Sequence, residues 1–188
     1  MAGSTTIPRG PHEIAMARGG RRAAVTVAVV ELHLRDAVHA SRAGTLRTTG
    51  PVRGVALPPL TGAVHAALYR PAGLGRLLER QAVRAALAEL RAGLVAAGWL
   101  RAFPPGRTGA ARRSLKQLRY RHPLPADRAG LQAEEILLAV ALYGDRALTA
   151  LAPRFARDAG LTGRGGSTER ESPGLSCGSG SGMSCGVV

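Results

Sequence analysis

The segment from Pro11 to Gly50 constrains the fold of this chain more than any other part of the sequence. Gly20 to about Arg35 is rich in alanine and valine, and its length favours a helix in spite of its β-branched residues. Two short extended segments follow, residues 37–41 and 45–49, joined by Arg42-Ala43-Gly44. A helix followed by a small hairpin is the order of a winged-helix unit, which binds nucleic acid or docks on another protein. We therefore expect a winged-helix-like helix-plus-hairpin unit here.

The composition favours a mainly α fold. Hydrophobic residues make up 45% of the 188 residues, but aromatic residues only 3%, so the core has to be built from alanine, leucine and valine. Small side chains allow helices to approach closely, which makes helix-on-helix packing the natural architecture. We expect one compact helical domain over residues 11–160, a disordered leader over 1–10 and a disordered tail rich in glycine, serine and cysteine over 161–188.

Helical periodicity and capping signals place the other elements. A short helix begins at Pro11 and is ended by Gly19-Gly20. Val83, Leu87, Leu90 and Leu94 form one apolar stripe of a helix that Gly98 closes. Further helices are predicted over residues 60–69, 81–97, 110–121, 131–143 and 147–159, with an extended piece over 99–103. The extended piece after the helix over 81–97 leaves open a second, reduced winged-helix unit.

The net charge of +14 indicates a polyanionic partner or a biased genome. The chain has 26 basic residues, of which only Lys116 is a lysine, and 12 acidic ones. Such a balance attracts nucleic acid, anionic lipid and acidic protein alike. An arginine-, alanine- and glycine-rich composition is also typical of high-GC genomes, so a solvated basic surface without a dedicated partner stays an alternative.

The segment over residues 110–121 is the strongest candidate site. It has no acidic residue, Leu115 and Leu118 mark its packed face, and Tyr120 could stack on a base. Basic side chains at helical spacing can neutralise phosphates and make binding depend steeply on salt. The predicted polyanion-binding residues are Arg112, Arg113, Lys116, Arg119 and Arg121.

Arg42 and Arg47 would belong to the wing of the first unit. The neighbouring Arg18, Arg21 and Arg22 could also meet phosphates. The helix before the wing offers only Thr26 to read base edges, so it suits a packed scaffold better than a recognition helix. Winged-helix nucleic-acid binding is therefore the alternative function.

Nothing in the sequence indicates catalysis, a cofactor or a metal site. The acidic residues are dispersed, and the histidines have no cysteine or carboxylate at ligand spacing. Cys177 and Cys185 are short of the four ligands of a structural zinc, and we expect them to be unpaired or intermolecular. The sequence therefore predicts a protein that is not an enzyme and has no small-molecule substrate.

Several short motifs, taken in their order, resemble one protein family. They are Gly19-Gly20-Arg21-Arg22, the run from Gly44 to Gly50, Ala141-Leu142-Tyr143-Gly144, and the Gly/Ser tail with Cys177 and Cys185. This order resembles an uncharacterised family of actinobacterial proteins with Gly/Cys-rich C-terminal tails, many of them regarded as membrane proteins. The chain departs from that pattern because only the polar residues 122–129 follow the basic helix. The resemblance implies no activity, but it gives the arginine-rich helix a membrane-proximal origin.

Together these features predict a non-enzymatic interaction protein. Its basic surface would contact an acidic protein or the anionic inner leaflet of a membrane. No stretch reaches the roughly 18–20 apolar residues of a transmembrane helix, and no secretory signal is visible. We expect a cytoplasmic protein, with a place at the inner face of the membrane left open.

Overall fold

The computed structural model describes residues 10–42, 44–52 and 56–162. Over these residues the chain forms eight helices and two small two-stranded sheets, so the predicted mainly helical fold is confirmed. The predicted leader, apart from Gly10, and the predicted tail after Thr162, with Cys177 and Cys185, lie outside the described residues.

The first helix, α1 (Pro11–Leu34), is broken at the predicted Gly19-Gly20 pair. Gly20 has φ of 71° and ψ of −159°, a combination that is essentially restricted to glycine. In a straight helix, His12 and Glu31 would be about 28 Å apart. Their side chains in fact meet at 3.2 Å between Nε2 and Oε2. The break therefore folds the first arm of α1, before Gly19, back toward the second arm, after Gly20.

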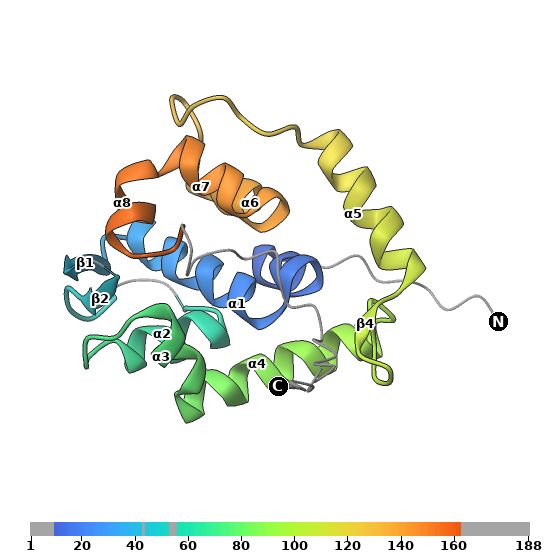
Figure 1. Cartoon of the computed structure of the whole chain (residues 1–188), viewed down its shortest axis with the longest axis horizontal. Helices are drawn as coiled ribbons and strands as arrows, with labels where there is room; N and C mark the ends of the chain where they lie inside the picture. The colour runs from blue at the N-terminus through green and yellow to red at the C-terminus, as the bar shows by residue number, and fades with distance from the viewer. Residues whose placement is uncertain (1–9, 43, 53–55, 163–188) are drawn as a thin grey trace, which may run out of the picture.

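The second arm of α1 is the centre of the molecule. Every residue from Ala23 to Leu32 is buried, on all sides of the helix. In Figure 1 one group of helices lies above α1 and another below it. The upper group is α6 (Ala133–Tyr143), α7 (Asp145–Leu151) and α8 (Pro153–Asp158), and the lower group is α2 (Pro59–Ala67), α3 (Leu74–Glu79) and α4 (Gln81–Ala96). Alanine and valine on the central helix allow both groups to pack closely against it.

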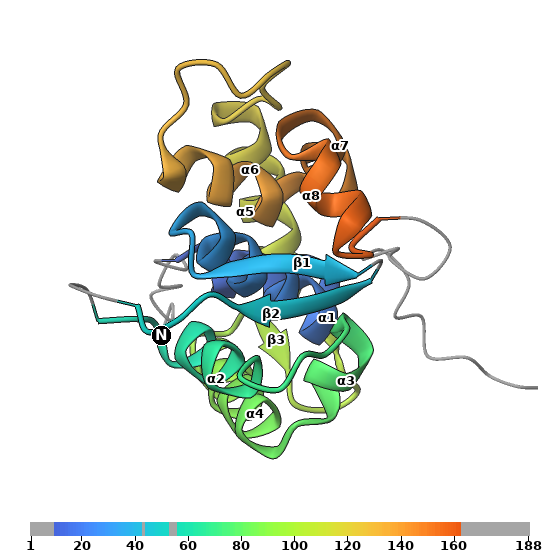
Figure 2. The same cartoon turned by 90° about the vertical axis from the view of Figure 1, so that its left-hand side faces the viewer.

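The hairpin predicted after α1 is present as β1 (Val38–Arg42) and β2 (Thr45–Thr48), paired antiparallel. The backbone of Leu46 exchanges two hydrogen bonds with Ala72, at 3.0 and 3.1 Å, and the Gly44 amide donates to the Asp158 carbonyl at 2.8 Å. Figure 2 shows the hairpin between the two groups of helices. The hairpin is therefore hydrogen-bonded to both groups of helices and connects them.

Two predicted elements differ from the structure. The single helix expected over residues 147–159 is wrong: it is α7 and α8, separated at Ala152, whose φ of −146° and ψ of 55° are not helical. Pro153 explains the break, because proline disfavours the helical conformation of the residue before it. The extended piece expected over 99–103 is part of a short hairpin, β3 (Leu100–Arg101) and β4 (Gly106–Arg107). The short helix α3 had no prediction.

Replacing Gly20 tests the break in α1. Gly20→Ala should lower the free energy of unfolding by about 1–3 kcal/mol, because alanine is strained at this backbone conformation. Urea denaturation followed by circular dichroism measures the change. Gly93→Ala in α4 is the matched control, since a Cβ there meets nothing within 4 Å. The control should be neutral or stabilising by up to about 1 kcal/mol, and an equal response of the two variants would contradict the folded-back arm.

Candidate functional site

The predicted basic helix is α5 (Gly109–Arg121), which forms the right-hand edge of the molecule in Figure 1. Thr108 fixes its start: its side-chain oxygen accepts a hydrogen bond from the Ala111 amide at 3.2 Å and donates one to the Gly98 carbonyl at 2.8 Å. Only Ala111 and Leu115 of α5 are buried. The helix therefore rests on the core along one narrow stripe and leaves most of its surface to solvent.

All five predicted polyanion-binding residues of α5 are exposed: Arg112, Arg113, Lys116, Arg119 and Arg121. Arg119 is the one that is anchored. Its Nε donates to the Leu142 carbonyl at 3.1 Å, and its guanidinium carbon lies 5.9 Å from the centre of the Tyr143 ring. Within the described residues the other four make no ion pair or side-chain hydrogen bond, so four cations of α5 are available to a ligand.

Two aromatic side chains, one in the hairpin before α5 and one in its last turn, are almost fully exposed. Phe103, in the turn between β3 and β4, is 90% exposed, and Tyr120 in the last turn of α5 is 88% exposed. Arg101 and Arg107 flank Phe103 on the two strands and are also exposed. The sequence pattern indicated Tyr120 but not Phe103. The Pro104-Pro105 pair that follows Phe103 could have indicated a turn there. The strands on either side have only two residues each, so the side chains of the turn do not reach the core.

The structure does not bring the predicted wing to this surface. The β1–β2 hairpin lies at the opposite end of the molecule from α5 (Figure 1). Arg47 in β2 is exposed. Arg42, at the end of β1, stands opposite Thr45 in the strand register. The helix before the hairpin is a buried scaffold, as expected, and it has no face free to enter a DNA groove. The assignment to the winged-helix class itself stays a prediction.

The prediction that Arg18 could contact a phosphate is wrong. Its side chain is buried, with 9% exposure, and its Nε donates to the Ala141 carbonyl at 2.8 Å. This hydrogen bond joins the first arm of α1 to α6. Arg18 therefore serves the fold.

The structure reveals a buried polar cluster that sequence reasoning missed, centred on Glu31. Thr61 donates to Glu31 Oε2 at 2.6 Å, Arg35 Nη2 lies 2.7 Å from Oε1, and His12 Nε2 lies 3.2 Å from Oε2. Glu31 is 4% exposed and Thr61 is fully buried. No sequence pattern marks this cluster, because its members are brought together only by the break in α1 and the docking of α2.

The cluster keeps Glu31 ionised. Burial raises the pKa of its carboxyl, but hydrogen bonds from His12 and Thr61 and the positive charge of Arg35 outweigh it, so the pKa lies below the ordinary value of 4.5. Side chains from three segments thus hold the carboxylate. The arrangement therefore acts as a fixed joint between the two arms of α1 and α2.

The other histidines are in unrelated places. His33 stacks on Phe155 with ring centres 3.7 Å apart, and burial lowers its pKa. His65 lies 3.0 Å from the Thr48 hydroxyl. In the part of the chain that the structure describes, no group of three or more histidine, cysteine or acidic residues could hold a metal ion.

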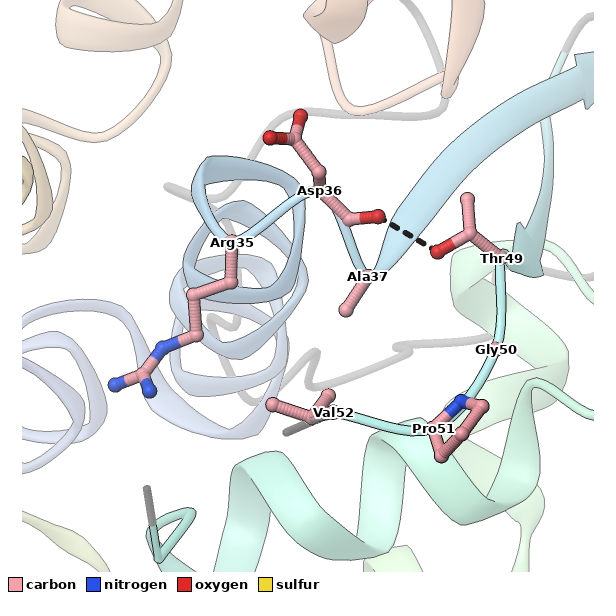
Figure 3. Close-up of a pocket in the computed structure, with 7 residues that line it drawn as sticks. All are labelled: Arg35, Asp36, Ala37, Thr49, Gly50, Pro51 and Val52. Atoms are coloured by element: carbon pink, nitrogen blue, oxygen red, sulfur yellow. Dashed lines mark hydrogen bonds between the residues drawn. The ribbon is translucent and has the colours of Figure 1, made fainter. Parts of the chain in front are cut away.

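A pocket of about 560 Å³ lies between the end of α1 and the segment after β2 (Figure 3). The Thr49 hydroxyl donates to the Asp36 carbonyl across it at 2.6 Å, and the Arg35 side chain points away from Thr49. The Thr49 hydroxyl and the Asp36 carbonyl are therefore bonded to each other, and Arg35 is bonded to Glu31. A larger pocket lies beside the Glu31 cluster.

Comparison with known proteins gives no match to a family model, to a curated protein or to a solved structure. The resemblance to an actinobacterial family therefore stays a prediction. Over the described residues, no helix combines the length and the apolar character that crossing a membrane requires.

The Glu31 cluster predicts how stability depends on pH. Because folding lowers the pKa of Glu31, its charge stabilises the fold fully above pH 4.5 and less as the pH falls through the folded-state pKa. Glu31→Gln should cost about 1–3 kcal/mol at neutral pH, since it leaves buried donors without a charged acceptor. The deficit should shrink in acid, as measured by urea denaturation over a pH series.

Glu79→Gln is the control, because Glu79 is exposed and makes no ion pair among the described residues. It should show no deficit at any pH. A deficit of Glu31→Gln that is the same at neutral and acidic pH would mean that packing, and not the charge, holds the joint.

Proposed function

We propose that this chain is a non-enzymatic interaction protein whose α5 surface binds the anionic inner leaflet of a membrane. This surface consists of the exposed cations of α5 and the turn between β3 and β4. The observation that supports the proposal best is an almost fully exposed phenylalanine in the hairpin that leads directly into α5, whose cations at residues 112, 113, 116 and 121 are unpaired among the described residues. An acidic protein would satisfy the cations alone, but it has no general need for the phenylalanine.

The charges supply attraction over a distance. Arg112, Arg113, Lys116 and Arg121 project from a helix without acidic residues. Each basic residue near an anionic leaflet contributes on the order of 1 kcal/mol, and the effect fades within a Debye length of about 8 Å at physiological salt. Such attraction brings the surface to lipid but does not hold it there at high salt.

Phe103 supplies the part that salt does not screen. An aromatic side chain fits the boundary between headgroups and acyl chains, where its ring leaves water. Arg101 and Arg107 on either side of the turn would meet headgroups while Phe103 inserts. Interfacial binding by one apolar anchor and a basic patch is the two-signal arrangement that peripheral attachment requires.

Nucleic-acid binding is the second candidate, favoured by Tyr120. This side chain is 88% exposed within the same row of cations and could stack on a base. Binding of this kind would depend on the α5 cations and on salt in the same way, but it would not depend on Phe103.

Charge reversal tests the role of α5. Arg112→Glu with Lys116→Glu should lower partitioning onto anionic vesicles at least about 30-fold, since each cation contributes about 1 kcal/mol. Arg119 is left unchanged because it anchors α5 to Leu142. Co-sedimentation with phosphatidylglycerol–phosphatidylcholine vesicles measures the change, beside neutral vesicles and duplex DNA.

Arg76→Glu with Arg84→Glu is the matched control, since both arginines are exposed on α3 and α4 and change the net charge equally. An equal loss in the two double variants would reduce the effect to net charge. Tight binding to DNA at physiological salt, with none to vesicles, would favour the nucleic-acid alternative.

Replacing Phe103 tests insertion separately from charge. Phe103→Ser should weaken vesicle binding about tenfold or more, as expected from the roughly 1.5–3 kcal/mol gained by removing such a side chain from water. Folding should be unaffected because the side chain is 90% exposed. Tyr69→Ser, at 59% exposure just after α2 and outside α5 and the β3–β4 hairpin, is the control and should bind normally. Full vesicle binding by Phe103→Ser would exclude insertion and leave a purely electrostatic contact.

A further inference from the structure

A pocket of about 790 Å³ lies beside the Glu31 cluster and has the form of a groove. Five segments line it: the first arm of α1, the end of its second arm, the start of α2, the middle of α4 and the first turns of α6. In Figures 1 and 2, α4 and α6 lie on opposite sides of α1, so they supply opposite walls of the groove.

The floor of the groove is apolar. Ile14, Leu60 and Leu137 line it as buried side chains, and Leu90 and Leu138 line it as half-buried ones. Leu90 belongs to the predicted apolar stripe of α4, whose other members Val83, Leu87 and Leu94 are fully packed in the core. Leu90 is therefore an apolar side chain of this stripe that the rest of the described protein covers only in part.

The charged residues that line the groove are mostly acidic, although the whole chain has a net charge of +14. Among the described residues, four acidic side chains line it, Glu13, Glu31, Glu89 and Glu134, and one arginine, Arg35. Arg35 is already bonded to Glu31. Glu89 on α4 and Glu134 on α6 are exposed at the two walls and make no ion pair or hydrogen bond with other described side chains.

We propose that this groove binds an amphipathic helix of a partner protein whose apolar face is flanked on both sides by lysine or arginine. Leucine-type side chains of that helix would cover Leu90 and Leu138, and its flanking cations would meet Glu89 and Glu134. An apolar floor between charged walls is the arrangement by which helices are held in grooves. The charge of the rest of the molecule repels a cationic helix elsewhere, so the acidic walls also make the groove selective.

A pair of designed peptides tests this inference. The first is an amphipathic helix of about 18 residues, five helical turns, made of leucine and lysine, and the second replaces each lysine with glutamate. Fluorescence anisotropy of the labelled peptides is measured with the full chain at about 0.15 M ionic strength. We expect the groove to bind the lysine peptide. A chain of net charge +14 that bound by overall charge would select the glutamate peptide instead, and no binding of the lysine peptide would overturn the inference.

Two variants locate the binding. Glu89→Lys with Glu134→Lys should weaken the lysine peptide at least about tenfold, because like charges would then face each other. Glu79→Lys with Asp158→Lys makes the same change of net charge at exposed positions outside the groove and should retain most of the affinity. An equal loss in both double variants would overturn the assignment to the groove.

Gly93→Trp blocks the groove without changing charge. Gly93 lines the groove on α4, and a Cβ there meets nothing within 4 Å, so the indole can enter the groove while the helix is kept. Peptide binding should fall at least about tenfold, as steric exclusion of a ligand predicts. Retained binding by Gly93→Trp would place the peptide elsewhere. Arg112→Glu with Lys116→Glu should not weaken the lysine peptide, which keeps this inference separate from the α5 surface.

Discussion

The ionised carboxylate of Glu31 is the interaction on which the arrangement of the helices depends. It is buried, and a buried carboxylate is costly unless donors surround it. Its three donors come from three segments: His12 on the first arm of α1, Arg35 at the end of the second, and Thr61 on α2. The carboxylate is satisfied only when the first arm is folded back and α2 is docked. One side chain therefore couples the break in α1 to the packing of the next helix.

A central helix without a solvent face imposes a second constraint. Polar groups inside it need partners of their own: Thr26 donates to the Arg22 carbonyl within the helix at 3.0 Å, and Glu31 is held by the donors described above. The remaining surface of the arm is alanine and valine, so each neighbouring helix gains little apolar area by itself. Stability then depends on having helices on every side, and the hairpin holds the two groups of helices together.

The sequence predicted what short-range chemistry determines. Gly19-Gly20, the hairpin, α4 and α5 follow from glycine conformations, alternation and helical spacing, and all are found in the structure. The Glu31 cluster could not be predicted because Thr61 is 30 positions from Glu31 and 49 from His12. Leu90 shows the same limit: periodicity identified it as apolar, but only the placement of α6 decides that it lines a groove. The break between α7 and α8 is the exception, since Pro153 was visible in the sequence and its effect on the residue before it was missed.

Packing alone accounts for part of the charge distribution, and this separates strong from weak indications of function. Because Ala111 and Leu115 occupy the packed stripe of α5, any charged residue of that helix has to face solvent. A genome rich in arginine codons would produce such a basic face without selection for a ligand. Neither packing nor codon bias calls for a phenylalanine left in water, or for glutamates gathered over half-buried leucines in a chain of net charge +14. Phe103, Glu89 and Glu134 are therefore stronger indications of binding than the net charge itself.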